Sequence, residues 1–187
     1  MSKLNRLLCI ATLSLAVGQP VFGQERVNTD AKTLKEFQAR IDAYMKLHEE
    51  AEGDAPKLKD KAEPEEIKAH EEALAAKIGA ARKTAKPGEI FTPEGRALFR
   101  RLMYPELKGK EGAETKAEIN EDAPAAVVLK INARYPANEP LPTVPPNLLA
   151  RLPKLPEELE YRIVGRTLIL RDVHANLIVD YIPNAIR

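Results

Sequence analysis

The 187-residue chain has one cysteine, Cys9, no tryptophan, and no serine after Ser14. A single cysteine excludes an internal disulfide, so the fold must be held together by packing. The sequence also lacks a Gly-x-Ser-x-Gly motif, a phosphate-binding glycine-rich loop and a His-Glu-x-x-His zinc motif. These absences exclude a serine hydrolase in a mature chain that begins after Ser14. They favour a protein that is not an enzyme and has no cofactor.

The chain also has no large excess of positive or negative charge, because 29 Lys and Arg residues are balanced by 28 Asp and Glu residues. A nucleic-acid-binding protein usually carries a basic patch, and this composition offers none. The carboxylates alternate with lysines and arginines, which is typical of a solvated surface and not of an acid–base pair. The sequence therefore predicts no nucleic-acid partner.

Only one long hydrophobic run is present, and it lies at the N-terminus. Lys3 and Arg6 precede the apolar residues 7–17, and Val21-Phe22-Gly23 resembles a cleavage site. An uncleaved membrane anchor is the weaker alternative, because a span needs about 20 apolar residues. The sequence predicts a signal peptide over residues 1–23 and a periplasmic or secreted protein with no membrane span after its removal.

Residues 24–107 are predicted to be helical. A first helix over about 30–50 and a second over about 64–85 each carry an apolar stripe at helical spacing. The polar connection 52–63 is interpreted as a solvated linker without a site. Two amphipathic helices joined by such a linker predict an antiparallel helical hairpin.

A third helix is predicted to begin at Thr92-Pro93-Glu94, with Thr92 as its N-cap, and to end before Pro105. Three arginines lie on its outer side: Arg96, Arg100 and Arg101. They could meet an anion, but a solvated helix face is the favoured interpretation.

The second half of the chain is predicted to begin with a flexible linker over residues 108–123, which is charged and poor in bulky apolar residues. Residues 124–131 are apolar enough for a short strand. Seven prolines between 136 and 156 predict an extended segment with one helical turn at 147–152. The leucines of this proline-rich segment predict that it wraps over the folded body.

The most apolar block of the mature chain is residues 159–182, which predicts three strands, 159–164, 167–171 and 177–181, with Gly165-Arg166 closing the first turn. Apolar residues fall on both faces, so one face should be covered by the rest of the chain and the other left for a partner. The predicted fold is α+β, with an antiparallel helical hairpin, a third helix, a proline-rich extended segment, and a C-terminal three-stranded antiparallel β-meander. It comprises residues 24–107 and 124–187.

Charged residues on these strands predict cross-strand ion pairs. The residues concerned are Arg162, Arg166, Arg171, Asp172 and Asp180.

The run LPKLPEELEYRIVGRTLILRDVHANLIVDYI, residues 152–182, resembles the C-terminal element of several small bacterial periplasmic families. In those families a proline-rich sequence leads into a tyrosine-bearing hairpin and an aliphatic strand. One family is associated with nickel and cobalt homeostasis, and others have no assigned activity. The run AKPGEIFTPE, with the helices before it, is similar to secreted bacterial proteins of uncharacterised function. The resemblance transfers no catalytic or ligand position.

Histidines are the remaining candidates for chemistry, at positions 48, 70 and 174. In an antiparallel helix pair His48 and His70 would lie about one turn apart on the shared seam. With Glu49, Glu71 or Glu72 they could form a mixed histidine–carboxylate metal site. Neither helix has a His-x₃-His or Glu-x-x-His spacing, so ordinary seam packing is the alternative. His174 is expected to lie exposed in a turn.

Two functions are consistent with these features. The first is a non-enzymatic exported protein of the cell envelope that binds an unknown envelope protein or has a structural role. The alternative is a periplasmic protein that handles nickel, cobalt or zinc.

Overall fold

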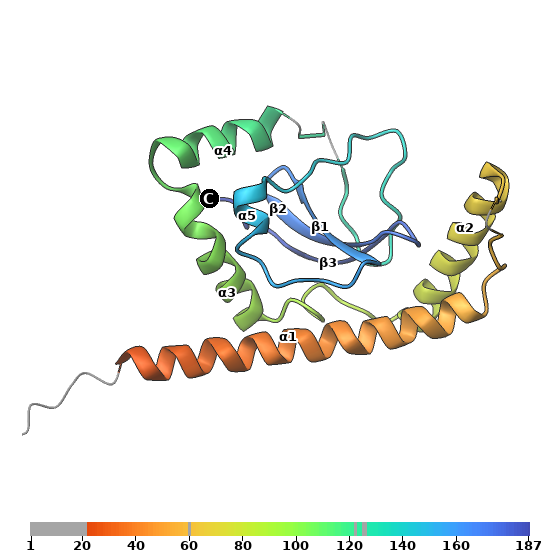
Figure 1. The fold of residues 1–187 in the computed structure, drawn as a ribbon, viewed down its shortest axis with the longest axis horizontal. Coiled ribbons are helices and arrows are strands. Elements are labelled where there is room, and N and C mark those ends of the chain that lie inside the picture. The colour runs from red at the N-terminus through yellow and green to blue at the C-terminus, as the bar shows by residue number, and fades with distance from the viewer. Residues whose placement is uncertain (1–21, 60, 122, 125–126) are drawn as a thin grey trace, which may run out of the picture.

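The structure, a computed structural model, describes residues 22–59, 61–121, 123–124 and 127–187. The described chain combines five α-helices with a three-stranded antiparallel sheet near the C-terminus (Figure 1). None of the described helices is both long enough and apolar enough to cross a membrane. The predicted signal peptide lies outside the described residues except for Phe22 and Gly23.

Helix α1 spans Phe22–Gly53 and lies along one side of the molecule (Figure 1). It begins before residue 30, where the sequence predicted its start, and it extends through Glu52, which the sequence assigned to the solvated linker. Its buried side follows helical spacing. The buried residues are Thr33, Phe37, Ile41, Tyr44, His48 and Ala51.

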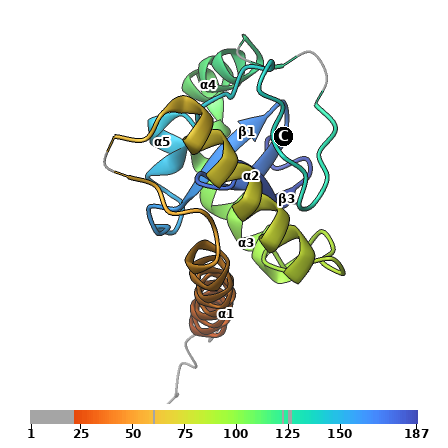
Figure 2. The same cartoon turned by 90° about the vertical axis from the view of Figure 1, so that its right-hand side faces the viewer.

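Helix α2 spans Pro64–Ala81 and ends earlier than predicted. It meets α1 at a steep angle in both views and does not lie antiparallel along it (Figures 1 and 2). Tyr44 and His48 of α1 form hydrogen bonds with the sheet instead, so a smaller part of the α1 surface is available to pack against α2. Ile67, predicted to lie in the seam, is therefore 48% exposed.

Helix α3 spans Pro93–Met103 and begins as predicted, because the Gly95 N–H donates to Oγ1 of Thr92 over 3.1 Å. Two of the arginines predicted to form a solvated face are bonded elsewhere. Arg100 donates to the carbonyl oxygen of Pro183 over 2.8 Å, and Arg101 pairs with Asp30.

A short 3₁₀ helix, η1, spans Tyr104–Leu107, and helix α4 spans Gly109–Glu121. The prediction of a flexible linker over 108–123 was therefore wrong for most of its length. The buried positions of α4 are Gly112, Thr115 and Ile119. Ile119 is the only large apolar residue among these three, so the composition of the segment resembled that of a linker. The spacing of the three buried residues is nevertheless helical.

The sheet is the predicted meander, with strands β1 (Leu159–Val164), β2 (Thr167–Asp172) and β3 (Leu177–Ile182) in that order. Gly165 has φ of 57° in the first turn, a conformation that glycine adopts without strain. The register passes from Leu170–Asp180 to Arg171–Ile178, so β3 bulges at Val179.

Both faces of the sheet are covered. One face joins the main core with α1, α2, α3 and the short helix α5 (Pro146–Leu149), which begins one residue before the predicted turn at 147–152 and ends inside it. On the other face, Val164, Ile169 and Ile178 pack with residues from 127–141. The prediction that one face is left for a partner was therefore wrong, because the segment before the proline-rich region folds back onto it.

The described residues of 124–131 contain no strand, which corrects a second prediction for this part of the chain. Residues 132–135 contact the edge of β3 instead. The Asn132 N–H donates to the carbonyl of Ile178 over 2.9 Å, and Arg134 forms an isolated bridge with Leu177.

The predicted cross-strand ion pairs of Asp172 and Asp180 are not formed. Glu160 takes their place, pairing with Arg162 and Arg171 at 2.6 Å each. The two aspartates are fully buried, and they accept hydrogen bonds from other elements of the fold.

Candidate metal centre

Asp180 is satisfied mainly by the loop before α3. Its carboxylate accepts N–H groups from Gly88 at 2.9 Å, Ile90 at 2.8 Å and Phe91 at 2.8 Å. Gly88 has φ of 99°, which lets the loop turn sharply enough to present these groups. Asp180 thus fixes the loop to the sheet through backbone donors.

Asp172, at the end of β2, is satisfied mainly by side chains of α1. One carboxylate oxygen accepts the Tyr44 hydroxyl at 2.6 Å and lies 2.7 Å from Nδ1 of His48. The other accepts the Ala175 N–H at 2.8 Å. Burial acts to raise the pKa of Asp172, but the hydrogen bonds from His48, Tyr44 and Ala175 lower it overall. The carboxyl group is therefore ionised at neutral pH.

The ionised Asp172 determines which nitrogen of His48 carries the proton. A carboxylate can only accept a hydrogen bond, so Nδ1 of His48 is the donor. In the neutral imidazole Nε2 then keeps its lone pair. Nε2 is buried, and among the described residues it has no hydrogen-bond partner. A buried nitrogen in this state is a ready metal ligand.

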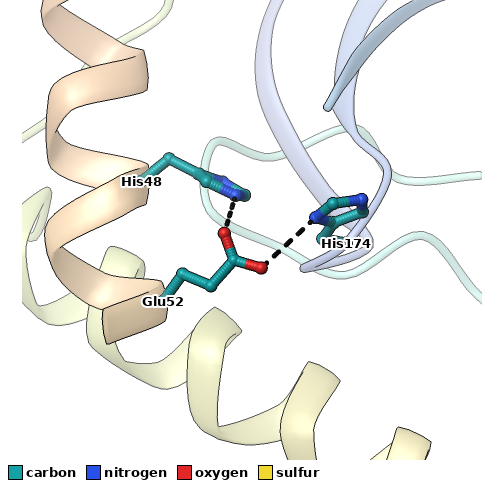
Figure 3. Close-up of side chains that lie close together, drawn as sticks. All are labelled: His48, Glu52 and His174. Carbon is teal, nitrogen blue, oxygen red and sulfur yellow. Dashed lines mark ion pairs between the residues drawn. The ribbon is translucent and has the colours of Figure 1, made fainter. Parts of the chain in front are cut away.

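Glu52 and His174 lie beside this nitrogen (Figure 3). Glu52 follows His48 by one helical turn on α1, and one of its oxygens lies 3.3 Å from Nε2 of His48. His174 comes from the turn between β2 and β3, and its Nδ1 lies 3.7 Å from the other Glu52 oxygen. Glu52 and His174 are partly exposed, so an ion could reach the group from solvent.

The spacing of these atoms suits a small divalent metal. One ligand atom from each of the three residues lies within 4.8 Å of the others. Ligands about 2.1 Å from a tetrahedral metal lie about 3.4 Å apart; here one Glu52 oxygen lies 3.3 Å from Nε2 of His48, and the other lies 3.7 Å from Nδ1 of His174. Two imidazoles and one carboxylate favour zinc, cobalt, nickel or copper over magnesium or calcium. The hydrogen bond from His48 to Asp172 is the outer-shell contact that commonly orients a metal-binding histidine.

The other predicted site residue, His70, lies just outside this group. Its Nδ1 lies 2.7 Å from the carbonyl oxygen of Pro56, and its Nε2 lies 4.0 Å from Glu52. The carboxylates that the sequence paired with the histidines are elsewhere. Glu49 is exposed, and Glu71 and Glu72 form ion pairs with Arg134.

Protonation supplies an alternative use for the same residues. Burial acts to lower the pKa of His48, but the hydrogen bond and charge of Asp172 and the charge of Glu52 raise it overall. A protonated His48 could therefore lie between two carboxylates. A metal ion at Nε2 would replace that proton.

Sequence reasoning missed Glu52 and His174 for different reasons. The spacing of His48 and Glu52, four residues apart, was visible, but the predicted helix ended too early to use it. His174 is separated from both by more than a hundred residues, and no local pattern connects it to α1.

Comparison of the chain with protein families, with curated proteins and with solved structures finds no match.

Proposed function

We propose that this protein binds a divalent transition metal through His48, Glu52 and His174, and that its role is metal handling in the cell envelope. The observation that carries the proposal is the buried Nε2 of His48, which has no hydrogen-bond partner among the described residues although a glutamate oxygen lies 3.3 Å away. A salt bridge to protonated His48 would be expected to form that hydrogen bond. A metal ion between the two atoms would satisfy both.

The proposed role is binding without catalysis. In metal-assisted hydrolysis a carboxylate beside the metal commonly serves as the general base. Here Glu52 would itself be a ligand, and both oxygens of Asp172 already accept hydrogen bonds. The location in the periplasm or outside the cell rests on the signal pattern of residues 1–23.

Isothermal titration of the chelator-treated full chain with Zn²⁺, Ni²⁺ and Co²⁺ tests the proposal. We expect one ion per chain, and loss of binding in His174→Ala and in Glu52→Gln. Both side chains are partly exposed, so these variants should fold. Glu49→Gln, an exposed carboxylate on the same helix, is the matched control and should bind as the wild type does. If Glu52→Gln binds the metal as tightly as the wild type does, the proposed site is wrong.

A second candidate function, protein or ligand binding, is favoured by a separate observation. A pocket of about 860 Å³ lies between α5, the segment after it and β1, lined by Leu149, Leu152, Leu155 and Tyr161 among others. The Tyr161 hydroxyl is buried and has no hydrogen-bond partner among the described residues. The mostly apolar lining would suit an apolar segment of a partner or an apolar ligand.

Binding of the dye 1-anilinonaphthalene-8-sulfonate tests this second candidate. We expect fluorescence enhancement by the wild type and its loss in Leu149→Glu. Leu149 is 48% exposed, so the charge should block the pocket without unfolding the chain. Equal enhancement by both proteins would remove the support for this function.

A further inference from the structure

His70 is held in the same way as His48, although it belongs to a different helix. Its Nδ1 lies 2.7 Å from the carbonyl oxygen of Pro56, and a carbonyl oxygen can only accept. Nδ1 therefore carries the proton, and Nε2 of the neutral ring keeps its lone pair. That nitrogen faces the Glu52 oxygen that His174 also approaches, at 4.0 Å from His70 and 3.7 Å from His174.

From this geometry we propose that His70 is the fourth ligand and that metal binding draws α2 toward the three residues already described. The inference rests on the proposed function, because it concerns the same metal centre. The resulting donor set, three imidazoles and one carboxylate, would complete a tetrahedral site for zinc or cobalt. A site closed by four protein ligands holds an ion and leaves no position for a substrate.

Metal binding requires α2 to move. Nε2 of His70 lies 4.0 Å from a Glu52 oxygen but is not among the ligand atoms that lie within 4.8 Å of one another, whereas ligands of a tetrahedral metal lie about 3.4 Å apart. The first turn of α2 is its less constrained end, because Ile67 is exposed, whereas Glu71 and Glu72 further along are held by ion pairs with Arg134. The carbonyl of Pro56 lies in the connection between the two helices and would move with the ring that it anchors.

The consequence is a metal-dependent latch. His48 and Glu52 belong to α1, His70 to α2, and His174 to the turn between β2 and β3. In the absence of metal, α2 is attached near this point by the Pro56 bond and by exposed ion pairs such as that of Lys77 and Asp54. With metal bound, the two helices and the β2–β3 turn share one ion. The connection at 54–63 should then resist local unfolding.

The substitution His70→Asn tests the two ring nitrogens of His70 separately: Nε2 as the proposed metal ligand, and Nδ1 as the donor to the carbonyl of Pro56. The asparagine amide can donate to the carbonyl of Pro56 from nearly the position of Nδ1, but it has no atom at the position of Nε2. The metal-free variant should therefore melt close to the wild type. With Co²⁺ as the probe, the wild type should show the intense visible absorption of a four-coordinate ion. In His70→Asn a water would replace the imidazole, so the spectrum should differ from that of the wild type, and the ion should bind at least about tenfold more weakly.

Two further measurements keep the test decisive. Zn²⁺ should slow cleavage of residues 54–63 by a protease in the wild type and not in His70→Asn. If the variant does not fold, the X-ray absorption spectrum of the zinc-loaded wild type counts the imidazoles, and three are expected. Two imidazoles, or identical Co²⁺ spectra for both proteins, would overturn the role of His70 and leave the three-residue site. No binding of Co²⁺ or Zn²⁺ by the wild type would overturn the proposed function itself.

Discussion

Asp172 and Asp180 are both fully buried on the same small sheet, yet they are satisfied by different kinds of donor. Asp180 accepts backbone N–H groups, and its network ends in the loop before α3. Asp172 accepts two side-chain donors, and through His48 its network reaches a buried nitrogen beside two partly exposed side chains. The first arrangement fixes a loop. The second leaves a directed lone pair, which is the chemistry that a metal site requires.

The largest expected effect comes from Asp180→Asn. The asparagine would turn an amide N–H₂ toward donors that now face a carboxylate, leaving buried N–H groups unpaired. We expect a loss of about 3 kcal/mol in the free energy of unfolding, measured by urea denaturation. Zinc binding by the folded variant should be unchanged. A selective loss of zinc affinity in this variant would remove the distinction between the two aspartates.

Asp172→Asn should have the opposite profile. The asparagine oxygen can still accept from Tyr44 and His48, so the loss of stability should be smaller, about 1–3 kcal/mol. Without the negative charge, His48 becomes a weaker ligand, and zinc affinity should fall about 10- to 100-fold by titration calorimetry. Unchanged zinc affinity in a folded Asp172→Asn protein would mean that His48 does not bind through Nε2.

Tyr44→Phe should have a milder effect on the same network. Burial, together with the charge and hydrogen bond of Asp172, raises the pKa of Tyr44, so its hydroxyl is a permanent donor. Its removal leaves Asp172 with two of its three donors. The free energy of unfolding, measured by thermal denaturation, should fall by about 1 kcal/mol. Zinc affinity should fall by less than about tenfold. A greater fall than in Asp172→Asn would show that the tyrosine itself contributes to the site.

The smallest effect concerns Glu160, the carboxylate that pairs with strand arginines. Burial acts to raise the pKa of Glu160, but hydrogen bonds and charges from Arg162 and Arg171 lower it overall. Its folded-state pKa thus lies below its unfolded value of about 4.3. The ionised form stabilises the fold above that pH, and the stabilisation is lost as pH falls through the folded-state pKa.

Glu160→Gln should therefore lower stability by about 1 kcal/mol or less at pH 7 and have a smaller effect at pH 3, measured as melting temperature. The exposed neighbour Glu157→Gln is the matched control and should differ little from the wild type at either pH. An equal loss at both pH values would indicate lost packing and not lost charge.

The C-terminal meander could be predicted from sequence because its signals are local. Runs of β-branched and aliphatic residues, with Gly165 between the first two strands, are sufficient to define it. Helix α4 could not be predicted in this way. Its buried seam contains Gly112, which lies so close to the Leu107 backbone that a side chain would clash. Composition alone cannot distinguish such a seam from a linker.

The candidate metal centre was predictable only in part. His48 and His70 are on helices that the sequence indicated, and Glu52 would have followed from a correct end of α1. The roles of His174 and Asp172 depend on the β2–β3 turn reaching α1, and no periodicity encodes that contact. The charged residues of the strands were misassigned because cross-strand pairing was assumed, whereas the buried aspartates face helix α1 and the loop before α3.

Anomalous diffraction at the zinc absorption edge, from crystals of the zinc-loaded full chain, would show whether His48, Glu52 and His174 hold an ion. We expect a single strong peak about 2.0–2.2 Å from Nε2 of His48, from a Glu52 oxygen and from Nδ1 of His174, with the His48–Asp172 hydrogen bond retained. A peak elsewhere in the molecule, or none at this position while Nε2 of His48 donates to Glu52, would contradict it.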